Sequence, residues 1–223
     1  MPASGAVTRS TLRQQIADAL RDEVLAGRMQ PGEEFTVKQI AEQYGVSATP
    51  VREALVDLCA QGLLDSDQHR GFRVRVFTVE DYRGIVEARA LVVDGMFRRA
   101  AAPGSLDTHG PALVSVRRRG EEAARAARCG DLNILVGYDL RFWRELCALA
   151  GNTYISDFLH RLRMQSWVFA VPHLRAHGEL SDWLWTGHGE VVSALALGDF
   201  EAARALIAAY NDESLMWAER LPR

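Results

Sequence analysis

The stretch Tyr44–Leu64, YGVSATPVREALVDLCAQGLL, ends one predicted helix and starts the next within a few residues. Gly45 permits a sharp turn, and Ser47 is placed as the N-cap of the following helix. Pro50 falls in the first turn of that helix, where a missing N–H costs nothing. Two helices joined by so short a turn predict a helix-turn-helix.

The second of these helices has an apolar side and a side free to meet another surface. The apolar residues at helical spacing are Val51, Ala54, Leu55, Leu58 and Cys59. The opposite side carries Ala48, Thr49, Arg52 and Val56. We interpret Arg52 as a groove-reading side chain; the alternative is a solvated arginine paired with Glu53 or Asp57.

The residues before this stretch predict two more helices. An amphipathic pattern begins at Ser10 or Thr11 and stops at Gly27, before a Pro-Gly pair. The next helix starts at Thr36, which has capping-box spacing to Gln39.

After the third helix, two extended runs, Leu63–Asp65 and Phe72–Phe77, flank a polar tip at Asp67–Gly71. In the second run we expect Phe72, Val74 and Val76 to point inward and Arg73 and Arg75 outward. Three helices and a β-wing describe a winged helix-turn-helix.

From Thr78 the pattern is almost unbroken helix, opening with capping-box spacing between Thr78 and Asp81. The predicted helices are Tyr82–Ala101, Ala112–Arg128, Asp131–Ala150, Thr153–Val171, Ser181–Leu197 and Asp199–Ala218. The sequence therefore predicts a mainly α protein with three parts: a flexible arm at 1–9, a DNA-binding domain at 10–77 and an all-helical bundle at 78–223.

Composition narrows the class of protein. The 223 residues are 48% hydrophobic, with no apolar run long enough for a membrane span and no apolar signal core at the start, so we expect a cytoplasmic protein. Residues 1–77 contain nine Lys/Arg and ten Asp/Glu, a net charge of −1, so phosphate attraction must come from local clusters such as Arg70, Arg73 and Arg75. Three cysteines, Cys59, Cys129 and Cys147, are interpreted as small core residues.

The segment VSATPVREALVDLCAQGLL, followed by HRGFRV, resembles the DNA-binding signature of GntR-type bacterial regulators. The segments GYDLRFWRELCALAGNTYI and GHGEVVSALALGDFEAARALI resemble the ligand-sensing FCD domain of the FadR-like subfamily. The resemblance implies a homodimeric transcription regulator, interpreted as a repressor, that binds a palindromic double-stranded operator and responds to a small-molecule effector.

The resemblance also assigns DNA contacts to this chain. By the family's pattern they fall on Lys38, Ser47, Ala48, Thr49, Arg52, His69, Arg70 and Gly71. Ala48 stands where the family commonly has an arginine. The operator of this protein should therefore differ from the operators of family members that use two arginines to contact bases.

Many FCD domains hold a divalent metal with one aspartate and three histidines. On the matching positions this chain keeps Asp139 and His188 but has Trp143 and Tyr210 in place of two histidines. An indole has no lone pair to offer and a neutral phenol is a poor zinc ligand, so we predict a pocket without metal or other cofactor. Its expected effector-binding residues are Arg89, for an acidic group, with Asp139, Trp143, His188 and Tyr210.

Several alternatives stay open. Trp143 and Tyr210 can be ordinary core residues, and His188 can be satisfied by a backbone carbonyl or by Asp139. A rearranged metal site could use His160, His173 or His177. Other functions are a metal-dependent hydrolase or lyase built on the bundle, and a DNA-binding protein without an effector. The run Arg117–Arg119 is interpreted as a solvated helix face.

Overall fold

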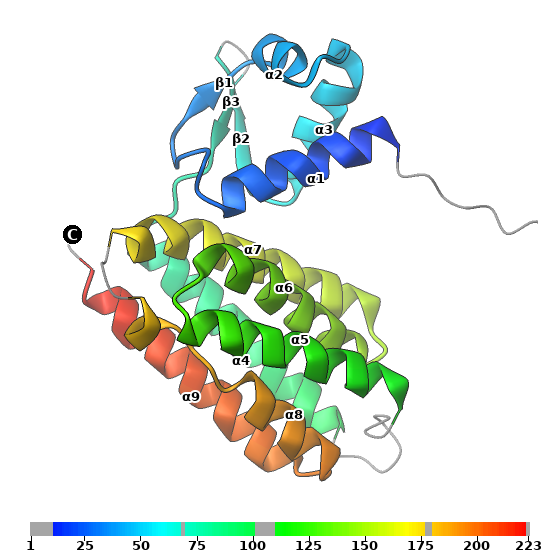
Figure 1. Cartoon of the computed structure of the whole chain (residues 1–223), viewed down its shortest axis with the longest axis vertical. Helices are drawn as coiled ribbons and strands as arrows, with labels where there is room; N and C mark the ends of the chain where they lie inside the picture. Colours follow the sequence, from blue (N-terminus) through cyan, green and yellow to red (C-terminus); the bar gives the residue numbers. More distant parts are fainter. Residues whose placement is uncertain (1–10, 68–69, 101–109, 177–179, 222–223) are drawn as a thin grey trace, which may run out of the picture. The chain divides into compact units, whose positions relative to one another are not determined.

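The computed structural model describes residues 11–67, 70–100, 110–176 and 180–221. The chain divides into two compact units, residues 1–76 and 77–223. The first unit contains α1 (Leu12–Leu25), β1 (Glu34–Phe35), α2 (Val37–Tyr44), α3 (Ala48–Ala60), β2 (Leu64–Asp67) and β3 (Gly71–Val74). The second contains α4 (Val79–Ala100), α5 (Pro111–Arg128), α6 (Leu132–Ala148), α7 (Thr153–Arg175), the 3₁₀ helix η1 (Ser181–Trp183), α8 (His188–Ala196) and α9 (Phe200–Glu219), as Figure 1 shows. The predicted mainly α fold class, with a small β-wing, is confirmed.

Side-chain caps define the helix starts in the first unit. Thr11 caps α1, and Thr36 forms the predicted capping box, in which its hydroxyl accepts from the backbone N–H of Gln39 while the Gln39 side chain accepts from the Thr36 N–H. Gly45 ends α2 in the left-handed region, with φ 64°. Ser47 occupies the N-cap position of α3, but its side chain makes no capping bond.

The wing is a three-stranded antiparallel sheet in the order β1-β3-β2, with Phe35 opposite Phe72 and Leu64 opposite Val74. The short strand β1 was not predicted, because two residues are too few to show an alternation. The expected inward position of Val76 is wrong: β3 ends at Val74, and Val76 is 55% exposed.

The predicted apolar side of α3 is confirmed at four positions. Val51, Ala54, Leu55 and Leu58 are fully buried. Cys59 is only half-buried. This side packs on α1, whose Ile16 and Leu20 are also buried, so α3 is anchored by one face and leaves the other to solvent.

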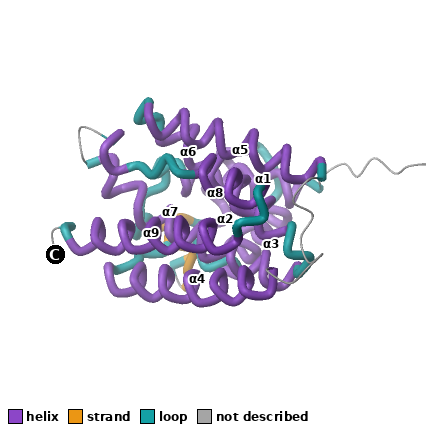
Figure 2. Tube along the Cα trace, turned by 90° about the horizontal axis from the view of Figure 1, so that it is seen from below, coloured by secondary structure: helices purple, strands orange, loops and turns teal. Residues whose placement is uncertain are grey.

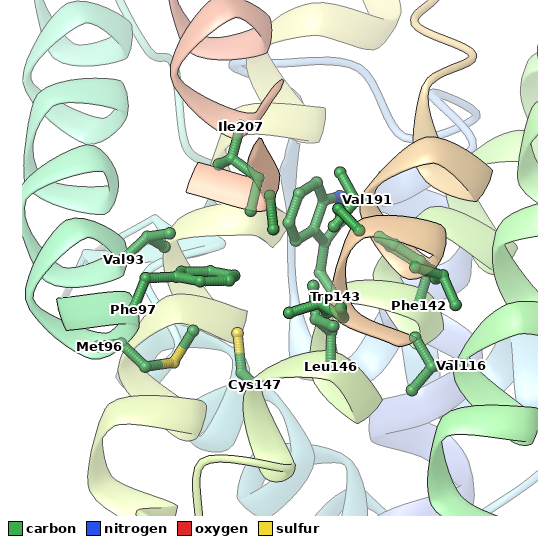
Figure 3. Close-up of a cluster of buried hydrophobic side chains, with 14 of the residues drawn as sticks. Val93, Met96, Phe97, Val116, Phe142, Trp143, Leu146, Cys147, Val191 and Ile207 are labelled. Atoms are coloured by element: carbon green, nitrogen blue, oxygen red, sulfur yellow. The ribbon is translucent and has the colours of Figure 1, made fainter. Parts of the chain in front are cut away.

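The second unit is an α-helical bundle, in which α4 lies beside α9 and α5 beside α6 (Figure 2). Thr78 and Asp81 form the predicted capping box at the start of α4. A core of aliphatic and aromatic side chains from α4, α5, α6, α7, α8 and α9 fills this bundle (Figure 3). No helix within the described ranges combines the length and the apolar character needed to cross a bilayer.

Three sequence predictions for this unit are wrong. Helix α7 does not stop before Pro172 but continues to Arg175, where burial of Leu174 holds the last turn against the core. The predicted single helix at 181–197 is a 3₁₀ turn, an irregular segment and then α8. Cys129 is exposed rather than a core residue.

Candidate functional site

The outer face of α3 carries an arginine that no other described residue engages. Ser47, Ala48, Thr49 and Arg52 are all exposed. Asp57, one of the two partners that the sequence left open for Arg52, instead accepts two bonds from Arg13 of α1, at 2.6 and 2.5 Å. In the described part of the chain the Arg52 guanidinium makes no ion pair, so it is available to an external acceptor.

An open groove between α2 and α3 brings several predicted contact residues together. It is lined by Val37, Lys38, Ala41, Glu42, Gly45, Val46, Ala48 and Arg52. Within it, the Lys38 Nζ lies 3.8 Å from a Glu42 carboxylate oxygen. Both side chains are exposed, and an exposed ion pair contributes little free energy. A phosphate can therefore replace Glu42 as the partner of Lys38.

The wing tip combines a loosely paired cation with a glycine that the backbone requires. Arg70 lies 3.7 Å from Glu34 in an exposed pair. Gly71 has φ +99°, and a Cβ at this position would lie 2.6 Å from the Phe35 carbonyl oxygen. His69 lies outside the described residues. The glycine therefore has a structural reason, quite apart from any contact with DNA.

The second unit encloses a cavity of about 330 Å³, lined from α4, α6, α7, α8, α9 and the segment 180–187. Its polar lining includes Asp139, Arg163, Ser166, His188, Tyr210, Glu213, Ser214 and Arg220. Its aromatic lining consists of Tyr82, Trp167, Trp183, Trp185, Tyr210 and Trp217. A concave, mostly apolar space with a few convergent polar groups is typical of a small-molecule site.

The carboxylate of Asp139 is fully buried and is held by three donors. One oxygen, Oδ1, accepts from the indole N–H of Trp143 at 2.8 Å and lies 3.0 Å from Nε2 of His188. The other, Oδ2, accepts from the indole N–H of Trp167 at 2.8 Å. Burial alone would raise the pKa of Asp139, but the His188 bond, the charge of Arg163 and the Trp167 bond outweigh it and lower the pKa below its ordinary value.

This donor set does not fit a divalent metal. Both Asp139 oxygens already accept N–H bonds, and the two indoles that occupy them offer no lone pair. Across residues 11–67, 70–100, 110–176 and 180–221, no three His, Cys, Asp or Glu side chains are grouped to hold an ion. Of the alternative ligands, His173 packs on Phe169 and His177 lies outside the described residues. Nε2 of His188 is bonded to Asp139, which is one of the two alternatives considered from the sequence, while its Nδ1 has no hydrogen-bond partner among the described residues.

Two arginines are buried beside Asp139. Arg163, 3% exposed, lines the cavity, donates to the Tyr210 hydroxyl at 2.8 Å, and lies 4.2 Å above the Trp143 ring. Arg89, 2% exposed, lies behind the lining and donates to Asn211 at 2.8 Å. Burial, together with repulsion from Arg163, lowers the pKa of Arg89 to about 10.

The structure brings the five predicted effector residues into one neighbourhood, but only three line the cavity. Asp139, His188 and Tyr210 face it, whereas Arg89 and Trp143 stand behind them. Trp143 belongs to the bundle core, among side chains of α4, α8 and α9 (Figure 3). Its ring stacks on that of Tyr210 at 6.0 Å, so it supports the cavity wall from behind.

Sequence reasoning missed Arg163, Trp167, Trp185 and Trp217. A signal for Arg163 was present, since it interrupts the apolar stripe of α7 between Leu159 and Trp167 at helical spacing. No local signal pointed to Trp185, which reaches the cavity from an irregular segment. Its indole folds back over Gly187, where an added Cβ would lie 2.7 Å from the ring.

Comparisons with known proteins agree with both halves of this description. Residues 12–74 match the family described as "Bacterial regulatory proteins, gntR family", and residues 84–213 match the FCD domain. A "Probable D-xylose utilization operon transcriptional repressor" of Paenarthrobacter nicotinovorans is 30% identical over 88% of this chain and 84% of its own length.

Two solved structures share the fold. Escherichia coli McbR/YncC superposes with a TM-score of 0.79 at 20% identity, covering 95% of this chain and 99% of its own. A GntR regulator from Rhodococcus sp. RHA1 gives 0.73 at 24% identity, covering 95% and 99%. The family and all of these relatives are regulators, so the alternative of a metal-dependent enzyme is wrong. The chain belongs to the GntR family of bacterial regulatory proteins, and with its FCD domain it is a ligand-responsive, DNA-binding transcription regulator.

Proposed function

We propose that this regulator is a homodimeric repressor that acts in the cytoplasm on a palindromic operator. Two copies of α3 would enter successive major grooves, and the wings would reach the flanking minor grooves. A small acidic effector in the cavity of the second unit would bind the DNA-competent and incompetent arrangements with different affinity and thereby decide which is populated.

The observation that carries the DNA-binding proposal is the unpaired Arg52 on the solvent face of an otherwise anchored helix. A free guanidinium fork can bond the O6 and N7 of a guanine, with no internal ion pair to break first. Ala48 and Thr49, exposed on the same face, are small enough to allow the helix close to base edges. Ala48 can contact a thymine methyl but cannot hydrogen-bond a guanine. In each operator half-site, α3 would therefore read one guanine with an arginine, namely Arg52.

The remaining contacts are assigned to the phosphate backbone. Lys38 lies across the groove from Arg52, and Ser47 has a hydroxyl that does not cap its own helix. Arg70 and Gly71 form the described part of the wing tip, while His69 is assigned by the family's pattern alone. These contacts position the protein and contribute little to sequence choice.

The effector proposal rests on the cavity and its polar lining. Asp139, His188 and Tyr210 would face the ligand directly. Trp143 would act through Asp139, and Arg89 would act through Ser166, which also lines the cavity. The relative described above is named for a D-xylose utilization operon, so a sugar is the competing effector class.

Fluorescence anisotropy with a selected operator and a scrambled duplex tests the DNA contacts. We expect Arg52→Ala to weaken operator binding by about 1–3 kcal/mol and to affect the scrambled duplex less, whereas Lys38→Ala should weaken both and lower the salt slope. Arg141→Ala, an exposed arginine of α6, is the charge-matched control. Equal losses on both duplexes for Arg52→Ala would contradict its assignment to base reading.

A metabolite panel followed by thermal unfolding and the same anisotropy assay tests the effector. A ligand that binds only the folded chain raises the free energy of unfolding by RT ln(1 + [L]/Kd). Light scattering with and without operator tests the homodimer. If no compound changes either stability or operator binding, the protein is the effector-independent DNA binder instead.

A further inference from the structure

The buried charges around the cavity do not balance. Among the described residues, the buried Arg89 and Arg163 each carry one positive charge and the buried Asp139 carries one negative charge, a sum of +1. At the mouth, the exposed Glu213 and Arg220 cancel each other. A guanidinium taken out of water without a counterion is costly, so the site gains by receiving one negative charge.

Asp139 cannot meet this need by itself, because its two oxygens are occupied by two indoles and His188. Arg89 has only neutral acceptors in the described structure, namely Asn211 at 2.8 Å and Ser166 at 3.4 Å. Arg163 is bonded to a phenol and not to a carboxylate. Both guanidinium groups therefore lie close to the cavity without a direct anionic partner.

Unsatisfied polar atoms gather at the same place. Within the described residues, the buried side-chain nitrogens without a hydrogen-bond partner are Nε of Arg89, Nδ1 of His188 and Nε1 of Trp217. His188 and Trp217 line the cavity, and Arg89 is bonded to Ser166, which also lines it. Buried polar groups are nearly always paired, so these atoms favour a water or a ligand that can bond them. Two of these three atoms are donors, which again favours an acceptor ligand.

The walls select the shape of the ligand. Rings of Trp185 and Tyr210 lie 4.5 Å apart at 33° on one side, and Tyr82 meets Trp217 edge-on at 6.0 Å on another. These rings pack on one another and also line the cavity, so a flat ligand with a π system can add an aromatic contact to them. A volume near 330 Å³ is at the small end for a ligand pocket.

We propose that the cavity binds a small aromatic monocarboxylate, whose single negative charge is held by Arg163 and supported by Arg89 without a metal ion. This inference rests on the proposed function, since it names the chemical class of the effector. Neutral sugars and dicarboxylates should therefore bind this cavity less tightly than aromatic monocarboxylates do.

Isothermal titration of the full-length protein tests the charge and the shape separately. The probes are benzoate, phenylacetate and indole-3-acetate, against benzamide (no charge), isophthalate (a second charge), cyclohexanecarboxylate (no π system) and D-xylose. We expect at least one aromatic monocarboxylate to bind tenfold or more tightly than each of its four comparators. A comparator that binds equally well or better overturns the corresponding part of the proposal.

A pair of variants tests the role of Arg163. Arg163→Met keeps the length and apolar stem of the side chain, and it should weaken benzoate binding at least tenfold while leaving benzamide binding within about twofold. Arg141→Met, an exposed arginine on α6, should change neither. Circular dichroism and the unfolding temperature establish that both variants fold. Equal losses for benzoate and benzamide would mean that Arg163 only supports the fold, and would overturn its assignment.

The two levels of proposal fail in different ways. If D-xylose or another uncharged metabolite raises the unfolding temperature and alters operator binding, the monocarboxylate class is wrong but the sensor function stands. If no aromatic monocarboxylate binds and a broad metabolite panel also has no effect, both the ligand class and the effector function are wrong.

Discussion

Replacing Asp139 by asparagine tests the network beneath the cavity with a change of one atom. The carboxylate accepts from Trp143 and His188 on one oxygen and from Trp167 on the other. An amide keeps one acceptor, so whichever way it turns, its NH2 group faces at least one indole N–H. A buried donor left without an acceptor costs about 1–3 kcal/mol, and the surviving bonds lose their charge assistance. We therefore expect Asp139→Asn to lower the free energy of unfolding by about 2–4 kcal/mol.

Urea denaturation followed by tryptophan fluorescence and circular dichroism measures this loss. Asp157→Asn is the matched control, because Asp157 is exposed on α7 and should change stability by less than about 0.5 kcal/mol. Trp167→Phe removes one of the donors to Asp139. The double variant with Asp139→Asn should therefore lose less free energy of unfolding than the sum of the losses in the two single variants.

The pH dependence provides a second measurement. The pKa of Asp139 is lower in the folded chain than in the unfolded chain. Its contribution to the free energy of unfolding is therefore fully present above the unfolded pKa of about 3.9 and is lost as the pH falls through the folded pKa. The difference between wild type and Asp139→Asn should therefore be largest near pH 7 and shrink below about pH 4. A variant as stable as wild type at pH 7, or a difference that grows in acid, would refute the hydrogen-bond network as described.

Three further outcomes follow from the structure. Gly71→Ala should destabilise the first unit by more than about 1 kcal/mol in urea denaturation, because φ is +99° and the new Cβ would meet the Phe35 carbonyl; Gly84→Ala, with open space around it, is the control, and equal effects would contradict this reasoning. Thr36→Ala should cost about 0.5–2 kcal/mol by the same measurement, because it removes the hydroxyl that accepts from the Gln39 backbone N–H, and no loss would mean that α2 does not depend on its cap. Burial raises the pKa of Cys147 to about 11, so a thiol reagent at pH 8 should label the exposed Cys129 first and Cys147 only on unfolding; early labelling of Cys147 would contradict its burial.

The first unit could be predicted from sequence to within a few residues because its decisive signals are local. A capping box, a glycine in the left-handed region and a proline in a first helical turn each act within four residues, so the boundaries of α2 and α3 followed directly. The errors lie where tertiary packing overrides a local rule. Pro172 stays inside α7, where Leu174 of the following turn is buried, and the irregular segment before α8 lines a cavity that periodicity cannot reveal.

The candidate effector site was predicted only in part, for the same reason. The i, i+4 spacing placed Asp139 and Trp143 on one face of a single helix, and their indole-carboxylate bond forms across that spacing. The bond between His188 and Asp139 joins positions 49 residues apart, and family resemblance, rather than any local pattern, brought them together in the prediction. Arg163 and the tryptophans of α7 and α9 converge through the packing of whole helices, which a single sequence does not specify.

Exchanging imidazole for indole one turn after Asp139 changes the chemistry of the whole bundle interior. An imidazole can offer a lone pair to a metal, whereas an indole offers only a donor, so here Trp143 and Trp167 direct N–H groups at the carboxylate. The carboxylate is then held in the interior by two indoles and His188, and the Arg163 guanidinium lies over the rings of Trp143 and Tyr210. In a site built around an ion, the metal would attract an anionic ligand. In the site proposed for this chain, the buried Arg163 guanidinium would attract the anionic ligand instead, so a chelator would not weaken that binding.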